Sequence, residues 1–374
     1  RNYAAACHIV IGGGFLNCIQ SASACSATIS GGSCNIIEGW AGCGSCYSTI
    51  GGGFKNCINS ATGSVAVSNT IAGGQINKIT AFVNNSTIGG GFGNFIAGLG
   101  GCPNSNGEKN SPHNTIGGGD RNTICDCNGL GKDNTIGGGS LNCIIGSCTT
   151  AAGKNCATIG NTIGGGCLNR ICGTGTGSEG EMNKYNVIGG GIGNCICNSG
   201  AFNVIAGGYA NRICINQRGH RGNAIGGGAC NTINACSTRS VIGGGNGNTI
   251  CDNDRGIIVG GVSNFVKYGA DNVILGGCGN CICSDTSVGS CTPSNNYIMG
   301  CNNCMIDTCV CDNAIVGGAC NKVCCRARYN IVGGFCNCLG GGTSTSQACA
   351  SAVFGRCNRS CGDNNFVVGC NNNA

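Results

Sequence analysis

The sequence predicts an all-β protein, a parallel β-solenoid of about 19 short coils that runs through residues 1–374 as one continuous repeat domain. The first observation is a motif, seen clearly in residues 163–171 (IGGGCLNRI), that recurs imperfectly nineteen times. Repeats 14 to 28 residues apart are typical of solenoids, arrays and propellers. The second is composition: 75 glycines and 3 prolines without a Gly-X-Y period exclude collagen. The third is that no 3.6-residue hydrophobic period is long enough for a helix.

Each repeat opens with an aliphatic residue that we expect to face the core. One coil alone cannot bury this residue, but stacked coils place the same residue above and below it, about 4.8 Å away. Nineteen coils at this rise predict a rod of roughly 90 Å. The openings are Ile11, Ile29, Ile50, Ile71, Ile88, Ile116, Ile136, Ile163, Ile188, Ile205, Ile225, Ile242, Ile258, Ile274, Ile298, Ile315, Ile331, Val353 and Val367.

The elements of one coil follow in a fixed order. A short first strand reads Asn or Ser, then Thr or Val, then the aliphatic residue, as in residues 114–116. Glycines then allow a tight turn with positive φ. A second short strand reads Asn, one variable residue and another aliphatic residue. Alternation predicts that both aliphatic residues point inward and that their neighbours point outward.

An Asn follows the glycines in all nineteen repeats. Asn tolerates a left-handed backbone, and its amide can bond to the backbone of a turn. Stacked in register, each amide can also donate to the next one. We therefore predict a structural ladder, represented by Asn94, Asn122, Asn142, Asn169, Asn194 and Asn211.

The variable lengths between repeats predict loops on one side of the solenoid. On solenoids such insertions are where binding tends to occur. The longest predicted loops are residues 101–113, 145–161, 173–186 and 340–351.

Three repeats with one glycine fewer carry a resemblance to a known family. Residues 298–305 (IMGCNNCM), 353–360 (VFGRCNRS) and 367–374 (VVGCNNNA) resemble the A-I-G-x-x-S-x-A head repeats of YadA-type trimeric autotransporter adhesins. The glycine-richer repeats are similar to variants in haemagglutinin-like proteins and in phage or virus tail fibres. The resemblance implies a left-handed β-roll, often of three chains side by side, in an adhesive or structural fibre. Ile in place of Ala, the cysteines and the lack of a coiled-coil stalk depart from that family.

Thirty-eight cysteines favour disulfides and an oxidising location. In-register parallel neighbours lie within the Cα separation that a disulfide spans. We therefore expect bridges from coil to coil. The candidates are Cys172, Cys197 and Cys214 after the second strand, and Cys320, Cys336 and Cys357 before the Asn.

The outward positions beside the first Ile change character along the chain. Seven consecutive repeats carry Thr there: Thr28, Thr49, Thr70, Thr87, Thr115, Thr135 and Thr162. From Val187 onward the positions are apolar, including Leu275, Met299, Val332, Phe354 and Val368. A long exposed apolar column is unusual for a monomer, so we expect another chain or the chain's own loops to cover it.

End-to-end assembly is a further expectation. The step from Val367 of one copy to Ile11 of the next falls within the internal range of repeat spacings. Stacked subunits would then form an open filament, with Cys7 and Cys370 near the joint.

We expect no enzymatic activity, catalytic residue, cofactor or bound metal, because no carboxylate pair recurs in register and the 3 histidines lie in distant repeats. The basic residues behind the net charge of +6 are scattered, which argues against binding of nucleic acid, and no apolar stretch is long enough to span a membrane.

The leading hypothesis is a structural subunit of an extracellular, cell-surface or virion-surface fibre that self-associates, with glycans or a host receptor as targets of its loops. The alternatives are an ice-binding solenoid, which draws on the Thr column, and a cysteine-rich metal binder.

Overall fold

The computed structural model describes residues 2–5, 7–20, 25–39, 45–60, 67–98, 112–126, 131–146, 158–173, 183–198, 200–215, 222–283, 293–306, 310–324, 327–340 and 348–374. The chain divides into two compact units, residues 1–203 (unit 1) and 204–374 (unit 2). The described residues form strands and turns and contain no helix.

In unit 1, nine coils each contribute one strand to a first-strand sheet and one to a second-strand sheet, and every pairing is parallel. The first-strand sheet holds β2 (Val10–Ile11), β4 (Thr28–Ile29), β6 (Thr49–Ile50), β8 (Thr70–Ile71), β10 (Thr87–Ile88), β12 (Thr115–Ile116), β14 (Thr135–Ile136), β16 (Thr162–Ile163) and β18 (Val187–Ile188). The second-strand sheet holds β1 (Tyr3–Ala5), β3 (Cys18–Gln20), β5 (Ile36–Glu38), β7 (Cys57–Asn59), β9 (Lys78–Thr80), β11 (Phe95–Gly98), β13 (Thr123–Asp126), β15 (Cys143–Ile145), β17 (Arg170–Cys172) and β19 (Cys195–Asn198).

Unit 2 has the same plan, with ten first strands. They are β20 (Val204–Ile205), β22 (Ala224–Ile225), β24 (Val241–Ile242), β26 (Ile257–Ile258), β28 (Val273–Ile274), β30 (Tyr297–Cys301), β32 (Ala314–Ala319), β35 (Ile331–Phe335), β38 (Ala352–Arg356) and β40 (Phe366–Cys370). The second strands are β21 (Arg212–Ile215), β23 (Thr232–Asn234), β25 (Thr249–Asp254), β27 (Phe265–Ala270), β29 (Cys281–Cys283), β31 (Cys304–Ile306), β33 (Lys322–Cys324), β36 (Cys338–Leu339) and β39 (Arg359–Ser360). A further short pair joins β34 (Ala327–Arg328) and β37 (Ala348–Cys349).

The core of each unit is a double column of aliphatic side chains between the two sheets. In the coil of β14 and β15, Ile136 and Ile144 are both fully buried. Ile136 pairs in register with Ile116 on one side and Ile163 on the other. Burying one such side chain stabilises the fold by about 2 kcal/mol. The predicted inward and outward alternation is therefore confirmed.

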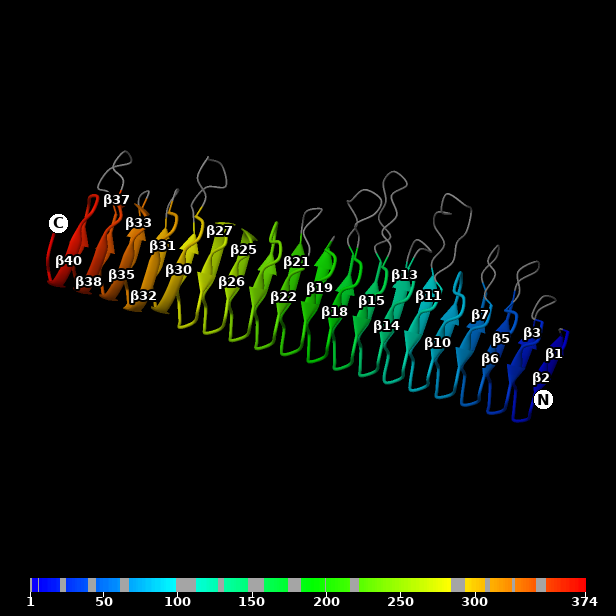
Figure 1. The fold of residues 1–374 in the computed structure, drawn as a ribbon. Coiled ribbons are helices and arrows are strands. Elements are labelled where there is room, and N and C mark those ends of the chain that lie inside the picture. Colours follow the sequence, from blue (N-terminus) through cyan, green and yellow to red (C-terminus); the bar gives the residue numbers. More distant parts are fainter. Residues whose placement is uncertain are drawn as a thin grey trace, which may run out of the picture. The chain divides into compact units, whose positions relative to one another are not determined.

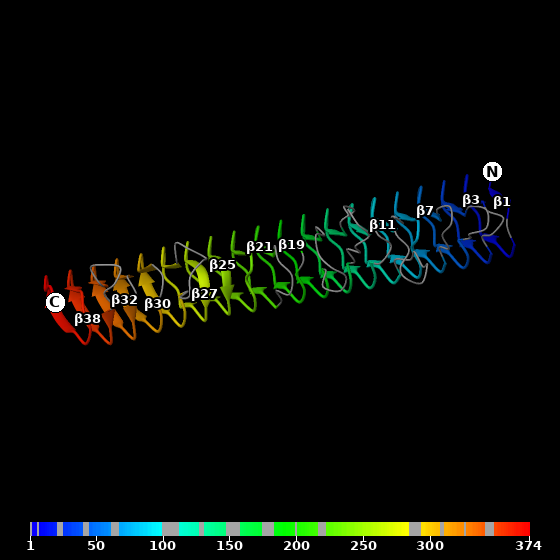
Figure 2. The ribbon, with the colours of Figure 1, turned by 90° about the horizontal axis from the view of Figure 1, so that it is seen from above.

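The glycine-rich turns that join the two strands of a coil lie along one edge of each unit (Figure 1). Gly166 shows why glycine is needed there: its φ is +84°, and a Cβ atom would lie 2.1 Å from the carbonyl oxygen of Gly191 in the next coil. Gly165, one residue earlier, would place a Cβ atom in open space. Glycine thus allows the turns of successive coils to stack at strand spacing, as the repeating ribbon of Figure 2 shows within each unit.

One predicted opening is wrong by a single residue. Ile331 pairs with Ala314 and is 45% exposed, whereas Val332 pairs with Ile315 and is fully buried. The turn after Val332 has one residue fewer, so this is a fourth short coil, and Val332 does not belong to the outer face. The neighbouring β32 keeps the longer turn, and its pairing with β30 and β35 shifts register at an irregularity, as one extra residue requires.

The predicted all-β parallel solenoid is confirmed. Its left-handedness and the single continuous domain over residues 1–374 stay predictions. Most of the four predicted long loops, including residues 101–111, 147–157, 174–182 and 341–347, lies outside the described residues.

Candidate interaction surface

The predicted Asn ladder is present within each unit, and its members from Asn17 to Asn358 are buried, whereas the last one, Asn372, is exposed. The backbone N–H of Asn122 donates to Oδ1 of Asn94, and the same bond links Asn142 to Asn122. Asn169 and Asn194 continue the ladder. In unit 2, Asn211 Oδ1 accepts the N–H of Asn231.

The side-chain amides of this ladder bond mainly to turn carbonyls, as expected for an Asn beside a tight turn. Nδ2 of Asn122 donates to the carbonyl oxygens of Gly118 in its own coil and Gly139 in the next, both at 2.9 Å. Direct amide-to-amide bonds also occur, as from Asn94 Nδ2 to Asn77 Oδ1 at 3.2 Å. Each Asn therefore joins three successive coils.

A second buried ladder precedes the first strands and was not predicted. The N–H and Nδ2 groups of Asn134 both donate to Oδ1 of Asn114, at 3.0 and 3.1 Å. Asn161 bonds to Asn134, and Asn186 to Asn161, in the same way. The sequence signal is the Asn or Ser that precedes most of the first strands, which the pattern alone marks only as part of a β-favouring segment.

In unit 1 the outer face of the first-strand sheet carries the predicted Thr column. Thr28 pairs in register with Thr49, and the pairing continues without interruption to Thr162. All seven side chains are half-buried. Gly, Ser or Ala occupies the neighbouring outward position of these coils, so the face is flat and uncharged.

In unit 2 the same outward positions form two columns that we call the apolar face. Four predicted interface residues lie here: Leu275 is 51%, Met299 44% and Val368 56% exposed, and Phe354 is half-buried. Met299 is in register with Val316, and Phe354 with Val368. The first column is Val204, Ala224, Val241, Ile257, Val273, Tyr297, Ala314, Ile331, Ala352 and Phe366; the second is Ala206, Gly226, Gly243, Val259, Leu275, Met299, Val316, Gly333, Phe354 and Val368.

The other two predicted interface residues lie elsewhere. Cys7 is an exposed residue of unit 1, outside the sheets. Cys370 ends β40 in unit 2, where it is exposed and in register with Arg356. The role of these two cysteines at a joint stays a prediction.

No disulfide joins any two of the described cysteines, so bridges among Cys172, Cys197 and Cys214 stay a prediction. Cys172 and Cys197 are in-register partners on β17 and β19, and both are buried. Cys214 belongs to unit 2, where its partner is Asn234. In-register side chains leave parallel strands in the same direction, so their Cβ atoms stay near the strand spacing of about 4.8 Å rather than the roughly 3.8 Å of a disulfide.

The second predicted set, Cys320, Cys336 and Cys357, forms a column of thiols in three successive turns, again without bridges. All three have left-handed φ values of 54–58°. Burial and the neighbouring thiols of Cys320 and Cys357 raise the pKa of Cys336. Cys336 in this column therefore favours the protonated thiol, because a thiolate there would be partly desolvated and repelled by its neighbours.

Thiols also gather on the second-strand sheet. Sγ of Cys281 lies 3.3 Å from Sγ of Cys283 on the same strand, and Cys304 is the in-register neighbour of Cys281. Hydrogen bonding to Cys283, then to Cys304, raises the pKa of Cys281. Over the described residues, however, no group of three or more His, Cys, Asp or Glu side chains is arranged to hold a metal ion.

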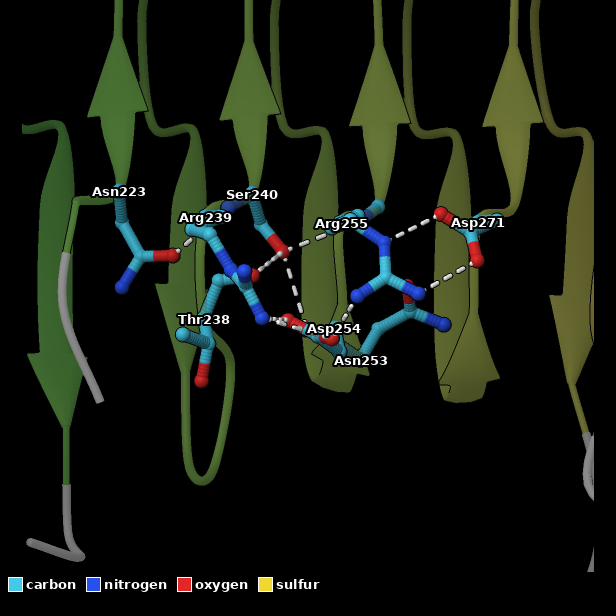
Figure 3. Close-up of polar contacts among 9 residues, drawn as sticks. Asn223, Thr238, Arg239, Ser240, Asn253, Asp254, Arg255 and Asp271 are labelled. Carbon is cyan, nitrogen blue, oxygen red and sulfur yellow. Dashed lines mark hydrogen bonds and ion pairs between the residues drawn. The ribbon is translucent and has the colours of Figure 1, made fainter. Parts of the chain in front are cut away.

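A ladder of exposed charges at the corners of unit 2 was also not predicted (Figure 3). Arg239 donates to both oxygens of Asp254, at 3.2 and 3.3 Å. Arg255 bonds to Asp254 and makes a bidentate pair with Asp271, at 2.6 and 2.7 Å. The hydrogen bond from Arg255 lowers the pKa of Asp271. Like the Asn ladders, these pairs link one coil to the next.

No protein-family model matches this sequence, and no curated protein matches it either. Nor does any helix long and apolar enough to cross a membrane occur in the described part of the chain. The candidate surface has two contrasting parts, the Thr column of unit 1 and the apolar face of unit 2, which occupy equivalent positions of the repeat.

Proposed function

We propose that this chain is a structural subunit of an extracellular or virion fibre that assembles by association with itself. The observation that carries the proposal is the pair of buried ladders. Asn122 and Asn134 each bond to side chains or backbone of neighbouring coils. The ladder of Asn122 continues through each unit, and the ladder of Asn134 is interrupted at Ala27 in unit 1 and at Gly256 in unit 2.

Such ladders favour a load-bearing role. A solenoid gains its stability from contacts between adjacent repeats, so each coil holds the next along the whole unit. The buried amide of Asn134 also donates to the carbonyl oxygen of Thr158 at 2.8 Å, which leaves few unsatisfied polar groups to admit water. A body built in this way resists local opening, the first step of proteolysis.

The partners that follow from this proposal are further copies of the chain and, through the inter-coil loops, cell-surface glycans or a host receptor. Loops can vary in sequence because the ladders and the Ile columns, not the loops, determine the fold. The resemblance to adhesin-head and tail-fibre repeats supports the same assignment.

Immunogold electron microscopy tests the proposal. Antibodies raised against the purified chain should label filaments or fibres on the outside of source cells or released particles. Permeabilised cells, labelled in parallel, control for protein inside. Label confined to the cell interior and absent from all external structures would overturn the assignment.

The seven in-register threonines favour a second candidate function, ice binding. They repeat at strand spacing, about 4.8 Å, which lies close to an oxygen repeat of the ice lattice. Methyl and hydroxyl groups on a flat, uncharged face suit ordered water. Thermal hysteresis of the purified protein, and its loss in Thr87→Lys/Thr135→Lys, would support this function; ordinary colligative freezing would exclude it.

A further inference from the structure

The apolar face of unit 2 is continuous over ten coils and contains no charged residue. Of its twenty positions only Tyr297 adds a polar side-chain atom. Phe366 is 77% exposed, and Val259, Leu275 and Val368 are each more than half exposed. The described residues of the chain therefore leave this face open to solvent, and an apolar surface of this extent marks an interaction site.

The opposite side of the same unit differs sharply. Outward positions of the second-strand sheet include Arg212, Lys322 and Arg359, with Lys267 nearby. The absence of charge from the apolar face is thus a property of that face and not of the unit. Within its two columns a partner meets no charged side chain, and an unpaired buried charge is the contact that costs most on association. The exposed Arg356 lies beside the columns, two residues after Phe354 on β38.

We propose that the apolar face of unit 2 packs against the apolar face of a second copy of this chain, related to the first by a twofold axis. The inference rests on the proposed structural function and names the first contact of the assembly. A twofold contact uses the same patch on both copies, so it requires only that the patch match itself.

Periodicity identifies the second copy as the partner. The side chains of the face stand in register from Val204 through Phe366, one set per coil, about 4.8 Å apart. A partner surface with the same coil spacing can interdigitate with the face over all ten coils. A surface without this spacing can match only a few coils before the two sets of side chains fall out of step. Two sheets packed in this way would lie about 10 Å apart, as in a β-sandwich.

The size of the face agrees with a stable dimer. Ten coils at about 4.8 Å extend roughly 45 Å, and two columns with their flanks span about 15 Å. Each copy would then bury about 700 Å², close to the roughly 800 Å² per partner of a standard interface. The bulky residues Leu275, Met299 and Phe354 lie within the face and would form the centre of the contact.

Sedimentation velocity and equilibrium of the full chain, at several concentrations, test this contact. The face variant is Val259→Lys/Met299→Lys, two exposed positions separated by one coil. The matched control, Thr232→Lys/Phe265→Lys, adds the same charge at the same spacing to the second-strand sheet of unit 2. Circular dichroism melting establishes that both variants are folded.

We expect the wild type and the control to dimerise in the same concentration range and the face variant to dimerise at least about tenfold more weakly. A wild type that stays monomeric at every concentration, or a face variant that dimerises as well as the control, would overturn the proposal. So would a monomer that floats with phosphatidylcholine vesicles, because lipid would then cover the face. Immunogold labelling is independent of this result, so the proposed function and this contact can fail separately.

Discussion

The backbone N–H of Asn248 donates a hydrogen bond to Oδ1 of Asn231, the residue at the same position one coil earlier. The amide of Asn248 also donates to the carbonyl oxygens of Gly244 and Gly261, both at 2.9 Å. Its own Oδ1 accepts the N–H of Asn264. One buried side chain therefore joins three successive coils. Its removal should weaken the contacts between all three.

Replacing Asn248 with Ala should lower the free energy of unfolding of the protein by about 3–5 kcal/mol. The substitution removes a partner from the buried N–H of Asn264 and from the part-buried carbonyl oxygens of Gly244 and Gly261. Each loss costs about 1–3 kcal/mol, with the part-buried carbonyls at the low end. Asn246→Ala is the matched control, because Asn246 lies in the same turn but is exposed. Urea unfolding followed by circular dichroism gives both values. Equal effects of the two substitutions would contradict the ladder's structural role.

Two adjacent glycines should respond differently to alanine. Gly166→Ala should cost about 3 kcal/mol or more, because φ is left-handed and the new Cβ atom would meet Gly191 of the next coil. Gly165→Ala should change stability by less than about 1 kcal/mol, since its Cβ atom points into open space. Thermal melting of the two variants checks this. A Gly166→Ala protein as stable as Gly165→Ala would show that the turns do not stack this closely.

Cys338 should be alkylated faster than Cys143. A hydrogen bond from Cys324, then the charges of Arg359 and Lys322 on the flanking strands, lowers the pKa of Cys338 to about 6. Burial raises the pKa of Cys143 to about 11. At pH 7.5 Cys338 is therefore largely thiolate, the nucleophilic form, and Cys143 is not.

Iodoacetamide labelling followed by peptide mass spectrometry measures both rates. The rate at Cys338 should fall below about pH 6 and should drop at neutral pH in Lys322→Gln/Arg359→Gln. Equal labelling of the two cysteines, or a rate at Cys338 that rises only above pH 8, would contradict the assigned electrostatics.

The ion pair of Arg255 and Asp271 should make a small, acid-sensitive contribution to stability. The hydrogen bond from Arg255 lowers the pKa of Asp271 below its ordinary value of 3.8, so folding favours the carboxylate. The contribution is therefore present above the ordinary value and is lost as pH falls through the lower, folded-state pKa. Because both side chains are partly exposed, the effect should be modest and weaker in high salt.

Melting temperatures between pH 2 and 6 test this contribution. The decrease in acid should be smaller in Asp271→Asn than in the wild type, with Asp312→Asn as a control for a generic loss of negative charge. If Asp271→Asn and the wild type decline in parallel, the pair does not contribute to stability.

The sequence was sufficient to predict which residues face the core because β-strand alternation and the stacking of coils leave little freedom. Ile136 and Ile144 are buried as expected, and the Asn ladder forms where it was predicted. The one-residue error at Ile331 arose because Ile331 and Val332 are both good core residues. Only the length of the following turn decides which of them points inward.

Other features depend on side-chain direction, which spacing alone does not specify. Cys172 and Cys197 satisfy the expected strand pairing, but the direction of parallel Cβ atoms also determines whether two sulfur atoms can bridge, and no disulfide joins them in this structure. The sequence shows the recurring Asn at the position of Asn134. It does not show that this side chain points into the core, because that depends on the backbone conformation just before each first strand. The charge ladder at Arg255 requires residues from separate coils that no local pattern relates.

Diffraction from native assemblies is the most direct test of the account. Filaments that antibodies against this chain label should be isolated from the source and examined by fibre diffraction or cryo-electron microscopy. A structural fibre of stacked coils predicts a strong repeat near 4.8 Å, the strand spacing, together with density for paired solenoids. Labelled filaments that lack this repeat, or native protein found only as a dispersed monomer, would contradict the central claim.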